Sequence, residues 1–437
     1  NIWAIEDLRS RLLVTLAFTA IYRFGSFIVL PGINPERLTA LREQTNEGLM
    51  SLLNMFSGGA FSNASVFALG IMPYISASIV IQLLALAVPY FQKMQREGES
   101  GRRKINQYTR YLTIGILMFQ APFYLLNLHV QSAGAIVAPW TMFLVSSTII
   151  LAAGSMFILW VGERITDRGI GNGVSLIIML GIIARLPQAF GQEVVSRFTG
   201  LTGGGLVTFL IEIIVLFGVI LASILLVQGV RKVPVQYAQR MVRGQQVGGA
   251  RQYIPLKLFA ANVMPIIFAQ AIMFVPATLA GLFSKGNATT GIAMLLSDYT
   301  SLPYNCIFAL LIVAFTYFYT AITMNPVQMA EDIKRNNGFI PGVRPGKDTA
   351  DYLDDIMSHL TLPGSVFLAF IACMPALAGL LDVKPEFAHF FGGTSLLILV
   401  GVVLDTLQQI ESHLLMRHYD GLLSSGRIRG RGGVSAY

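Results

Sequence analysis

Long apolar runs recur along the whole chain, and they restrict the fold more than any other feature of the sequence. Each run is close to the length of about 20 residues that an α-helix needs to cross a bilayer. A transmembrane β-barrel would instead show shorter segments of alternating polarity. The runs therefore predict an all-α polytopic membrane protein with ten transmembrane helices. These spans are expected at 12–30, 73–91, 108–128, 141–161, 174–190, 206–228, 256–283, 304–324, 360–380 and 394–412.

The composition agrees with this fold class. Hydrophobic residues make up 54% of the 437 residues, and charged residues make up only 12%. Soluble domains carry about 25% charged residues. The composition thus excludes an ordinary soluble protein.

Basic residues concentrate in alternate connections between the predicted spans. The connections 92–110 and 229–257 are rich in Lys and Arg, the second contains no acidic residue, and the C-terminal tail is basic as well. The positive-inside rule places such connections in the cytoplasm, so we expect both termini to be cytoplasmic. The connection 325–359 falls on the same side but has mixed charge. Its length fits either a solvated loop or a functional one.

The segment 59–70 interrupts the apolar pattern just before the second predicted span. Gly58 and Gly59 lie at its start, Gly70 and Pro73 at its end, and serine and asparagine lie between them. The pattern predicts a short amphipathic helix that cannot cross the bilayer. Membrane proteins keep such non-spanning backbone only where it is buried in protein or lines a water-filled cavity.

The chain lacks the sequence motifs of common active sites. No phosphate-binding loop, serine-nucleophile motif, zinc-protease motif or paired-cysteine motif occurs in it. The glycine-rich stretch 169–173 precedes a span instead of following a strand, and Cys306 and Cys373 lie in separate apolar runs. We therefore expect no catalytic residue, no cofactor and no metal site.

Charged residues inside the predicted spans are few. Among them, Arg23 and Glu212 lie toward the outer ends of the first and sixth spans, and Asp405 lies toward the inner half of the tenth. Intramembrane charges are functional candidates by default, and snorkelling or local pairing is the alternative explanation. A secondary transporter of a small solute would concentrate carboxylates near the midplane, which this chain does not do. Transport of a small solute is the alternative function for this chain.

Several stretches of distinctive sequence follow one another along the chain. They read FSGG at 56–59, FALGIMPYISASI at 67–79, WVGERIT at 160–166, GIGNG at 169–173, GFIPGVRPG at 338–346 and FGGTSLLI at 391–398. Together they closely resemble the SecY family of protein-conducting channels, and the resemblance covers essentially the whole chain.

This resemblance implies both an architecture and a function. It implies two inverted five-helix halves, residues 1–200 and 201–437, around a central hourglass pore that a short half-helix plug at 59–70 closes. A channel of this family would translocate unfolded secretory polypeptides across the bacterial cytoplasmic (inner) membrane. It would also release signal sequences and transmembrane segments laterally into lipid.

The resemblance also implies which residues close the pore. By motif position, a mid-membrane ring is expected from Ile75, Ile79, Ile178, Ile267 and Ile398. A narrow apolar ring gates by dewetting, because it does not hold water well. The plug would comprise Gly59, Ala60, Phe61, Ser62, Asn63, Ala64, Ser65, Val66 and Phe67.

A lateral gate is implied between the second and third spans on one side and the seventh and eighth on the other. Gln120 and Gln270 lie in otherwise apolar stretches of the third and seventh spans and would face this seam. Polar contacts between helices in lipid are worth about 0.6 kcal/mol on average, which is weak enough for apolar cargo to displace. Ordinary interhelical packing is the competing explanation.

The implied partners are SecE and SecG small membrane subunits, the SecA motor ATPase, the ribosome, unfolded preproteins and the lipid bilayer, without direct readout of nucleic acid. The connections 229–257 and 325–359 would dock the motor or the ribosome. The candidate docking residues are Arg344, within a Pro-Gly-rich turn, and Arg240 and Arg243. Gln245 and Gln246 stand where many relatives carry two basic residues, and Asn262 stands where Gly is usual.

Overall fold

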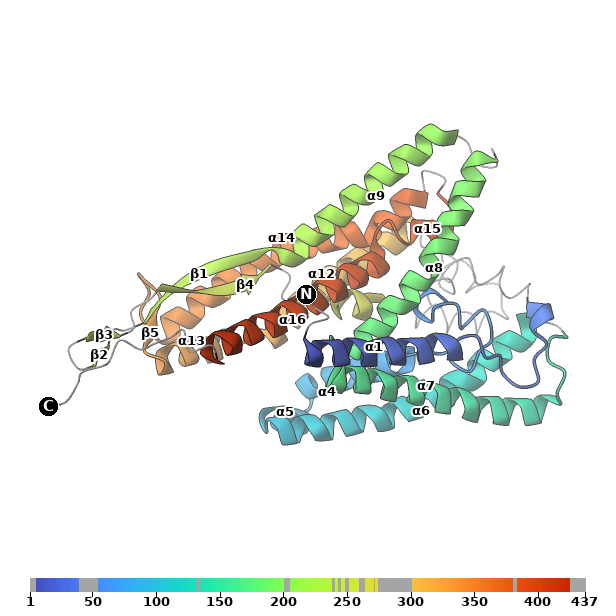
Figure 1. The fold of residues 1–437 in the computed structure, drawn as a ribbon, viewed down its shortest axis with the longest axis horizontal. Helices are drawn as coiled ribbons and strands as arrows, with labels where there is room; N and C mark the ends of the chain where they lie inside the picture. Colours follow the sequence, from blue (N-terminus) through green and yellow to red (C-terminus); the bar gives the residue numbers. More distant parts are fainter. Residues whose placement is uncertain are drawn as a thin grey trace.

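The computed structural model shows a largely helical protein (Figure 1). The structure describes residues 5–38, 54–131, 134–199, 205–237, 240–242, 245–247, 251–258, 264–270, 272–273, 301–379 and 383–424. Its helices are α1 (Glu6–Gly25), η2 (Pro35–Leu38), α4 (Met72–Ala87), α5 (Pro89–Arg96), α6 (Glu99–Gln131), α7 (Trp140–Arg168), α8 (Gly173–Phe198), α9 (Gly205–Gln228), α12 (Leu302–Thr323), α13 (Pro326–Arg335), α14 (Lys347–Gly379), α15 (Pro385–Ala388) and α16 (Gly393–Ser424). Its strands are β1 (Val230–Tyr237), β2 (Arg240–Val242), β3 (Gln245–Val247), β4 (Arg251–Lys257) and β5 (Gly338–Phe339).

The described helices are those of a polytopic membrane protein. By length and composition, seven of them can cross a membrane, or eight when the bent pair α4 and α5 counts as one span. Helix α4 ends at Ala87, the next residue, Val88, is extended before Pro89, and the two helices are bent relative to each other by 101°. Helix α1 covers most of the first predicted span, and most of the predicted span 256–283 lies outside the described residues. The predicted all-α polytopic fold class is confirmed.

Helix α8 connects two groups of helices (Figure 1). In the first group, α6 packs between α4 and α7, and α1 lies on α7. In the second, α14 packs against α12 and α16, and α9 lies against both α14 and α16. Helix α8 contacts α7 in the first group and α9, α15 and α16 in the second. The division of the chain into halves 1–200 and 201–437 and the inverted relation between these halves stay predictions.

The glycine-rich stretch 169–173 is where helices of both groups meet. The backbone N–H of Gly171 donates to Gln409 Oε1 of α16 at 2.8 Å, and the Thr15 hydroxyl of α1 accepts from Ile170 N. Asn172 caps α8 by accepting from the N–H of Val174. A Cβ at Gly173 would lie 1.9 Å from the carbonyl oxygen of Gly162 in α7. These glycines therefore permit close backbone packing.

A buried ion cluster joins the two groups. Arg197 of α8 donates from Nε to Glu193 Oε1 at 2.9 Å and from Nη2 to Glu212 Oε1 of α9, and all three side chains are almost fully buried. Glu193 Oε2 also accepts from the backbone N–H of Lys384, just before α15. Removing one partner of a buried ion pair costs about 3–5 kcal/mol, because an uncompensated charge remains. Of the two explanations for the intramembrane charge of Glu212, the structure shows local pairing.

The basic connection 229–257 forms a β-hairpin. Strands β1 and β4 pair antiparallel from Val230↔Lys257 to Gln236↔Arg251, and β5 pairs with the other edge of β1. Alternate residues Val233 and Val235 are buried against α13 and α14 residues. The alternation of apolar and polar residues in this connection is too short and too irregular to predict strands from sequence. Packing against α13 and α14 therefore decides that the connection forms strands.

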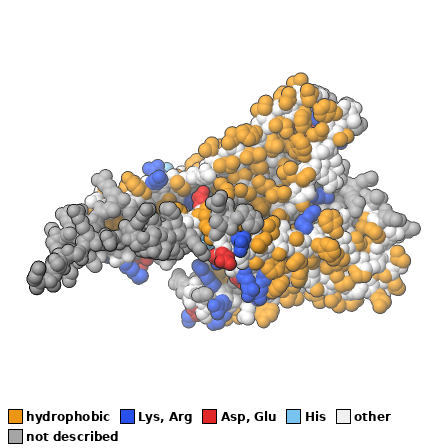
Figure 2. Space-filling view, in the orientation of Figure 1, with side chains coloured by type: hydrophobic (Ala, Val, Ile, Leu, Met, Phe, Trp, Pro, Cys, Tyr) orange, Lys and Arg blue, Asp and Glu red, His pale blue; other side chains and the backbone are white. Residues whose placement is uncertain are grey.

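The helices at this end of the molecule also extend beyond the predicted spans. Helix α6 begins at Glu99 and α14 at Lys347, although the predicted spans 108–128 and 360–380 begin about two to four turns later. The space-filling view shows Lys and Arg side chains gathered around α5 and the start of α6, whereas apolar side chains cover much of the rest (Figure 2). The basic connection 92–110 is therefore mostly helix that continues past the apolar surface.

Close packing of Gly181 against the chain before α4 yields a first prediction. A Cβ at Gly181 would lie 2.6 Å from the carbonyl oxygen of Phe56, whereas a Cβ at Gly191 on the same helix would meet nothing within 4 Å. We expect Gly181→Ala to lower stability by about 1–3 kcal/mol through overpacking. Gly191→Ala, the matched control, should keep or raise stability, because Ala favours helix over Gly by about 1 kcal/mol. Unfolding midpoints in detergent measure both, and equal midpoints would contradict the prediction.

Candidate functional site

Four of the five predicted ring isoleucines join one buried hydrophobic cluster, called here the central cluster. Ile178 of α8 and Ile398 of α16 are 6% and 3% exposed and belong to its core. Ile75 of α4 and Ile267 pack against it. Ile79 is buried as well, one turn beyond Ile75, but it is not among the described members of this cluster. Helices from both groups thus place short apolar side chains at one location.

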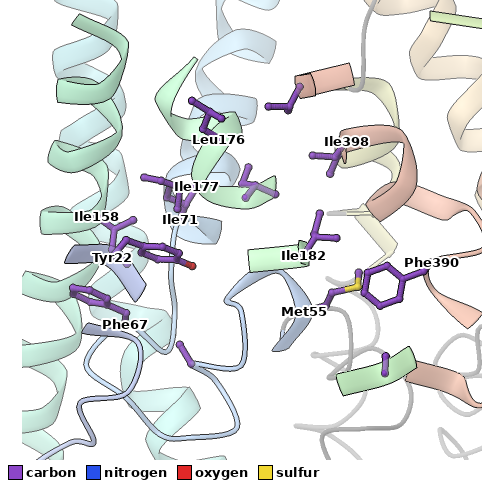
Figure 3. Packing of buried hydrophobic residues seen from close by; sticks show 14 of the residues in the cluster. Tyr22, Met55, Phe67, Ile71, Ile158, Leu176, Ile177, Ile182, Phe390 and Ile398 are labelled. Carbon is purple, nitrogen blue, oxygen red and sulfur yellow. The ribbon is translucent and has the colours of Figure 1, made fainter. Parts of the chain in front are cut away.

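The central cluster also includes residues from the predicted plug. Ala60 and Phe67 belong to its core, and Val66 packs against it. In the close-up, Phe67 lies beside the Tyr22 ring, and Met55 directs its sulfur toward the ring of Phe390 (Figure 3). Residues predicted for the ring and residues predicted for the plug therefore belong to one apolar cluster.

The predicted plug helix is wrong in its secondary structure. Residues 57–71, called here the turn segment, form successive turns, with no α-helix between 57 and 71. Gly58 and Gly59 have φ angles of +64° and +88°, and Ala64 and Gly70 also have positive φ. Backbone in this conformation cannot continue a right-handed helix. The amphipathic pattern did not reveal these interruptions.

Serines of the turn segment bind nearby backbone. The Ser62 hydroxyl donates to Gly59 O at 3.1 Å, and the Ser57 and Ser65 hydroxyls accept from the N–H groups of Phe61 and Phe67. Short hydroxyl side chains compete with helix in this way. All three serines are buried. Their polarity thus stabilises a compact turn.

Asn54 organises the start of the turn segment. Its Oδ1 accepts from the N–H of Ser62 at 3.0 Å, and its carbonyl accepts from the N–H of Gly59 at 2.8 Å. The Asn54 side chain is fully buried. One residue therefore satisfies backbone donors from two separate turns.

Side chains from α1 and α6 bind carbonyls of the turn segment. Arg23 Nη1 donates to Gly58 O at 2.9 Å, and Tyr22 Oη donates to Ser57 O at 3.3 Å. From the other side, Tyr124 Oη of α6 donates to Phe61 O at 2.8 Å. Backbone pairing adds a link to the chain after α1, where Leu30 N donates to Ala64 O. Several parts of the first group therefore hold the segment.

Aromatic packing completes these attachments. Phe67 stacks between Tyr22 and Phe157 of α7, with ring centroids 6.2 and 6.0 Å away. Phe61 contacts the Tyr124 ring at 4.7 Å. A Cβ at Gly154 of α7 would lie 2.3 Å from Val66 O, so glycine at this position lets the turn segment lie directly on α7.

The structure does not show the two predicted gate glutamines in contact with each other. Gln120 lies on α6, and its buried Oε1 has no hydrogen-bond partner among the described residues. Gln270 is 8% exposed and lines a cavity of about 40 Å³ together with Tyr304, Phe308, Pro375 and His389. Both glutamines lie within the apolar body of the molecule. Their role at the gate stays a prediction.

Two of the three predicted docking residues, Arg344 and Arg240, lie at the end of the molecule that carries the β-hairpin. Arg344 is exposed in the turn after β5, and its carbonyl accepts from the Thr349 hydroxyl at 2.8 Å. Arg240 lies in β2, paired with Val247, and its side chain is outside the description. Arg243 lies outside the described residues. Their docking role stays a prediction.

The described residues contain no group of three or more His, Cys, Asp or Glu side chains that could hold a metal ion. Cys306 and Cys373 are free thiols in the structure.

Sequence reasoning missed most of the side chains that hold the turn segment. Asn54, Tyr22 and Tyr124 carry no membrane-specific signal, and Arg23 appeared only as a charge near a span end. A buried Tyr needs a hydrogen-bond partner, but its partner here is a backbone carbonyl 63 residues away. The Asn before the glycine pair was the one available indication, because Asn favours turns.

Comparisons with known proteins place this geometry in a family. The SecY family profile matches residues 65–407. A protein translocase subunit SecY from Chlamydia trachomatis is 40% identical, with 99% of each chain covered, and one from Halalkalibacterium halodurans is 42% identical, with 97% and 98% covered.

Solved structures show the same fold. One solved SecY structure matches with a TM-score of 0.61 and 19% identity, over 92% of each chain. Its published description says that the plug domain of that SecY stabilises the closed state of the translocation channel. Sec61 in a canine ribosome–channel complex matches with a TM-score of 0.57 and 17% identity, over 92% of each chain. The all-α polytopic fold, in which helices of both groups contribute to the central cluster, is that of a protein-conducting channel. The chain belongs to the SecY family.

The central cluster yields a second prediction. Ile398→Asn would place an amide that needs hydrogen bonds among apolar side chains, at a cost of about 1–3 kcal/mol. The closed arrangement should weaken, and resting ion conductance across a planar bilayer should rise by about 10-fold. Ile398→Val, the matched control, keeps the cluster apolar and should stay near the parent value. Equal conductance in the Asn variant and the parent would contradict a sealing role for Ile398.

Burial of His389 yields a third prediction. This side chain, at the end of α15, is 5% exposed, and burial lowers its pKa from 6.5 to about 4. Between these values the unfolded chain binds a proton that the folded chain does not, so stability decreases as pH falls from 6.5 to 4. The loss should approach about 3 kcal/mol.

Unfolding midpoints measured in detergent from pH 7 to pH 4 test this expectation. His389→Gln should have a flatter pH profile than the parent across that window. An unchanged slope in the variant would show that another group causes the acid sensitivity.

Proposed function

We propose that this chain is a protein-conducting channel in the cytoplasmic membrane of a bacterium, closed in the described structure. The observation that carries the proposal is the central cluster, in which apolar side chains of α4, α8 and α16 meet residues of the turn segment. Family membership supports it, because the relatives are named protein translocase subunits.

The central cluster closes the pore by excluding water. Ile178, Ile398 and Phe67 are buried together, and a constriction of apolar side chains conducts ions poorly because it dewets. Isoleucine side chains offer a passing polypeptide no hydrogen bonds, so they can surround many different sequences without holding any of them.

The turn segment acts as the plug. It contacts the central cluster on one side and α1, α6 and α7 on the other. A chain that enters the pore displaces it, because the pore and the turn segment share the same apolar contacts. In the solved SecY structure with a described plug domain, that domain is said to maintain a membrane seal.

Signal sequences and transmembrane segments leave sideways through a seam beside α4 and α6, with Gln120 on one side and Gln270 on the other. The support is the position of both side chains in largely apolar surroundings. Interhelical polar contacts in lipid are weak, so an apolar segment can replace them.

The hairpin β1–β4 and the turn around Arg344 dock a partner that supplies the driving energy. The exposed Arg344 guanidinium suits recognition of carboxylate or RNA phosphate. Sec61, similar in fold, was solved in a complex with a ribosome, and a SecA-type motor would use the same surface. SecE- and SecG-type subunits would complete the channel, and both termini would be cytoplasmic.

The channel itself performs no chemistry under this proposal. The competing function, a secondary transporter, needs polar groups at the midplane. Two of the charged residues predicted inside spans have structural partners: Glu212 is paired with Arg197, and Arg23 binds the turn segment. These charges are thus engaged in structure.

Reconstitution of the full chain with its small subunits and a motor ATPase tests the proposal. A secretory precursor added outside such proteoliposomes should become protected from protease when ATP is present. Liposomes without the chain provide the control. Failure of protection with an active motor would overturn the channel assignment.

Arg344→Glu yields a fourth prediction. Reversing this exposed charge should reduce ATP-driven translocation at least 10-fold while leaving the channel folded and its resting conductance unchanged, because the Arg344 side chain is exposed and does not belong to the central cluster. Arg9→Glu, at an exposed residue of α1 outside the proposed docking connections, is the matched control and should translocate normally. Normal translocation by the Arg344 variant would refute the docking role.

A further inference from the structure

Helix α6 packs apolar side chains against the turn segment, and among its described side chains Tyr124 also makes a hydrogen bond to it. Tyr124 Oη donates to Phe61 O at 2.8 Å, and the Tyr124 ring packs on the Phe61 ring. Both residues are buried, Tyr124 at 5% exposure. A buried carbonyl that loses its donor is costly, so this bond favours the arrangement in which α6 and the turn segment stay together.

The same face of α6 carries the predicted gate residue. Gln120 precedes Tyr124 by four residues, and residues at this spacing lie on one side of a helix. Helix α6 packs on α4 and α7, so under the proposed function it borders the seam. A movement of α6 that admits an apolar segment beside Gln120 would therefore also move Tyr124.

The hydrogen bonds from α1 to the turn segment, unlike the one from α6, come from a helix away from the seam. Arg23 Nη1 donates to Gly58 O at 2.9 Å, but α1 packs on α7 and α8. Opening the seam beside α4 and α6 does not require α1 to move. The turn segment is therefore bound to one helix at the seam and to another helix away from it.

We propose that the Tyr124 hydroxyl couples the seam to the seal, so that an apolar segment entering beside α6 breaks the Tyr124–Phe61 bond and releases the turn segment. This inference rests on the proposed function and assigns a positioning residue to it. The bond is directed at a backbone carbonyl, so it does not depend on the side chain at residue 61. Arg23, in contrast, stabilises the closed seal whether or not the seam is occupied.

This assignment has a definite thermodynamic consequence. If seam occupancy already breaks the Tyr124 bond, removing the hydroxyl changes only the equilibrium of the unoccupied channel. The open probability without a signal peptide should then rise by about 5- to 10-fold, the range expected for one buried hydrogen bond. The open probability with a signal peptide should stay near the parent value. The stimulation by the peptide therefore decreases by the same factor.

Single-channel recording of the full chain in planar bilayers tests the inference, with and without a synthetic signal peptide. Tyr124→Phe keeps the ring and removes only the hydroxyl. Tyr111→Phe, at an exposed residue of the same helix, is the matched control and should behave as the parent. Arg23→Gln should raise the open probability by similar factors with and without the peptide, which leaves peptide stimulation unchanged.

The outcomes separate the inference from the function on which it rests. If Tyr124→Phe raises open probability equally with and without peptide, or changes neither, the coupling role is overturned while the channel function stands. If the parent chain does not respond to signal peptide at all, the proposed function and the coupling fail together. A second variant guards against a purely structural effect. In a chain that lacks residues 60–67, Tyr124→Phe should have no effect, and a remaining effect would overturn the assignment.

Discussion

The buried backbone of the turn segment is the constraint on which the rest of the structure depends. Non-helical backbone at membrane depth must satisfy its polar groups within the protein. Here the Asn54 side chain, the segment's own serines and donors from α1 and α6 do so. Arg23 of α1 and Tyr124 of α6 reach their carbonyls only when each helix lies at a particular place. The positions of α1 and α6 are therefore linked to the carbonyls of Gly58 and Phe61.

Under the proposed function, two kinds of interaction keep the channel closed, and they have different consequences. Apolar contact in the central cluster excludes water but is non-directional, so a passing polypeptide can replace it. The hydrogen bonds to the turn segment are directional, and each depends on the position of one helix. The seal is thus tolerant toward cargo sequence and sensitive to helix movement. That combination is what a channel needs if it must accept many polypeptides and still stay closed at rest.

The membrane spans could be proposed from sequence, and so could the four ring isoleucines that meet in the central cluster. Hydropathy and local motifs depend only on residues that are near one another in the chain. The turn segment was misjudged as a helix, since its turns are bound by residues distant in sequence: Arg23 donates to Gly58 O, and a Cβ at Gly58 would lie 3.1 Å from Gly181 Cα. The hairpin 230–257 was missed for a similar reason, because Val233 and Val235 are buried by helices distant in sequence. Tyr124 could not be recognised, because its partner is a backbone atom.

By itself, the sequence determined that the chain enters a membrane, where its helices cross and which segment cannot cross. These properties follow from the free energy of placing each residue in lipid, which is a local quantity. Tertiary structure alone decided that Ile178, Ile398 and Phe67 meet, that Glu212 is neutralised by Arg197, and that α6 is bonded to the turn segment. Such pairings depend on how distant helices pack. Their energies arise only when the two groups of helices come together around α8.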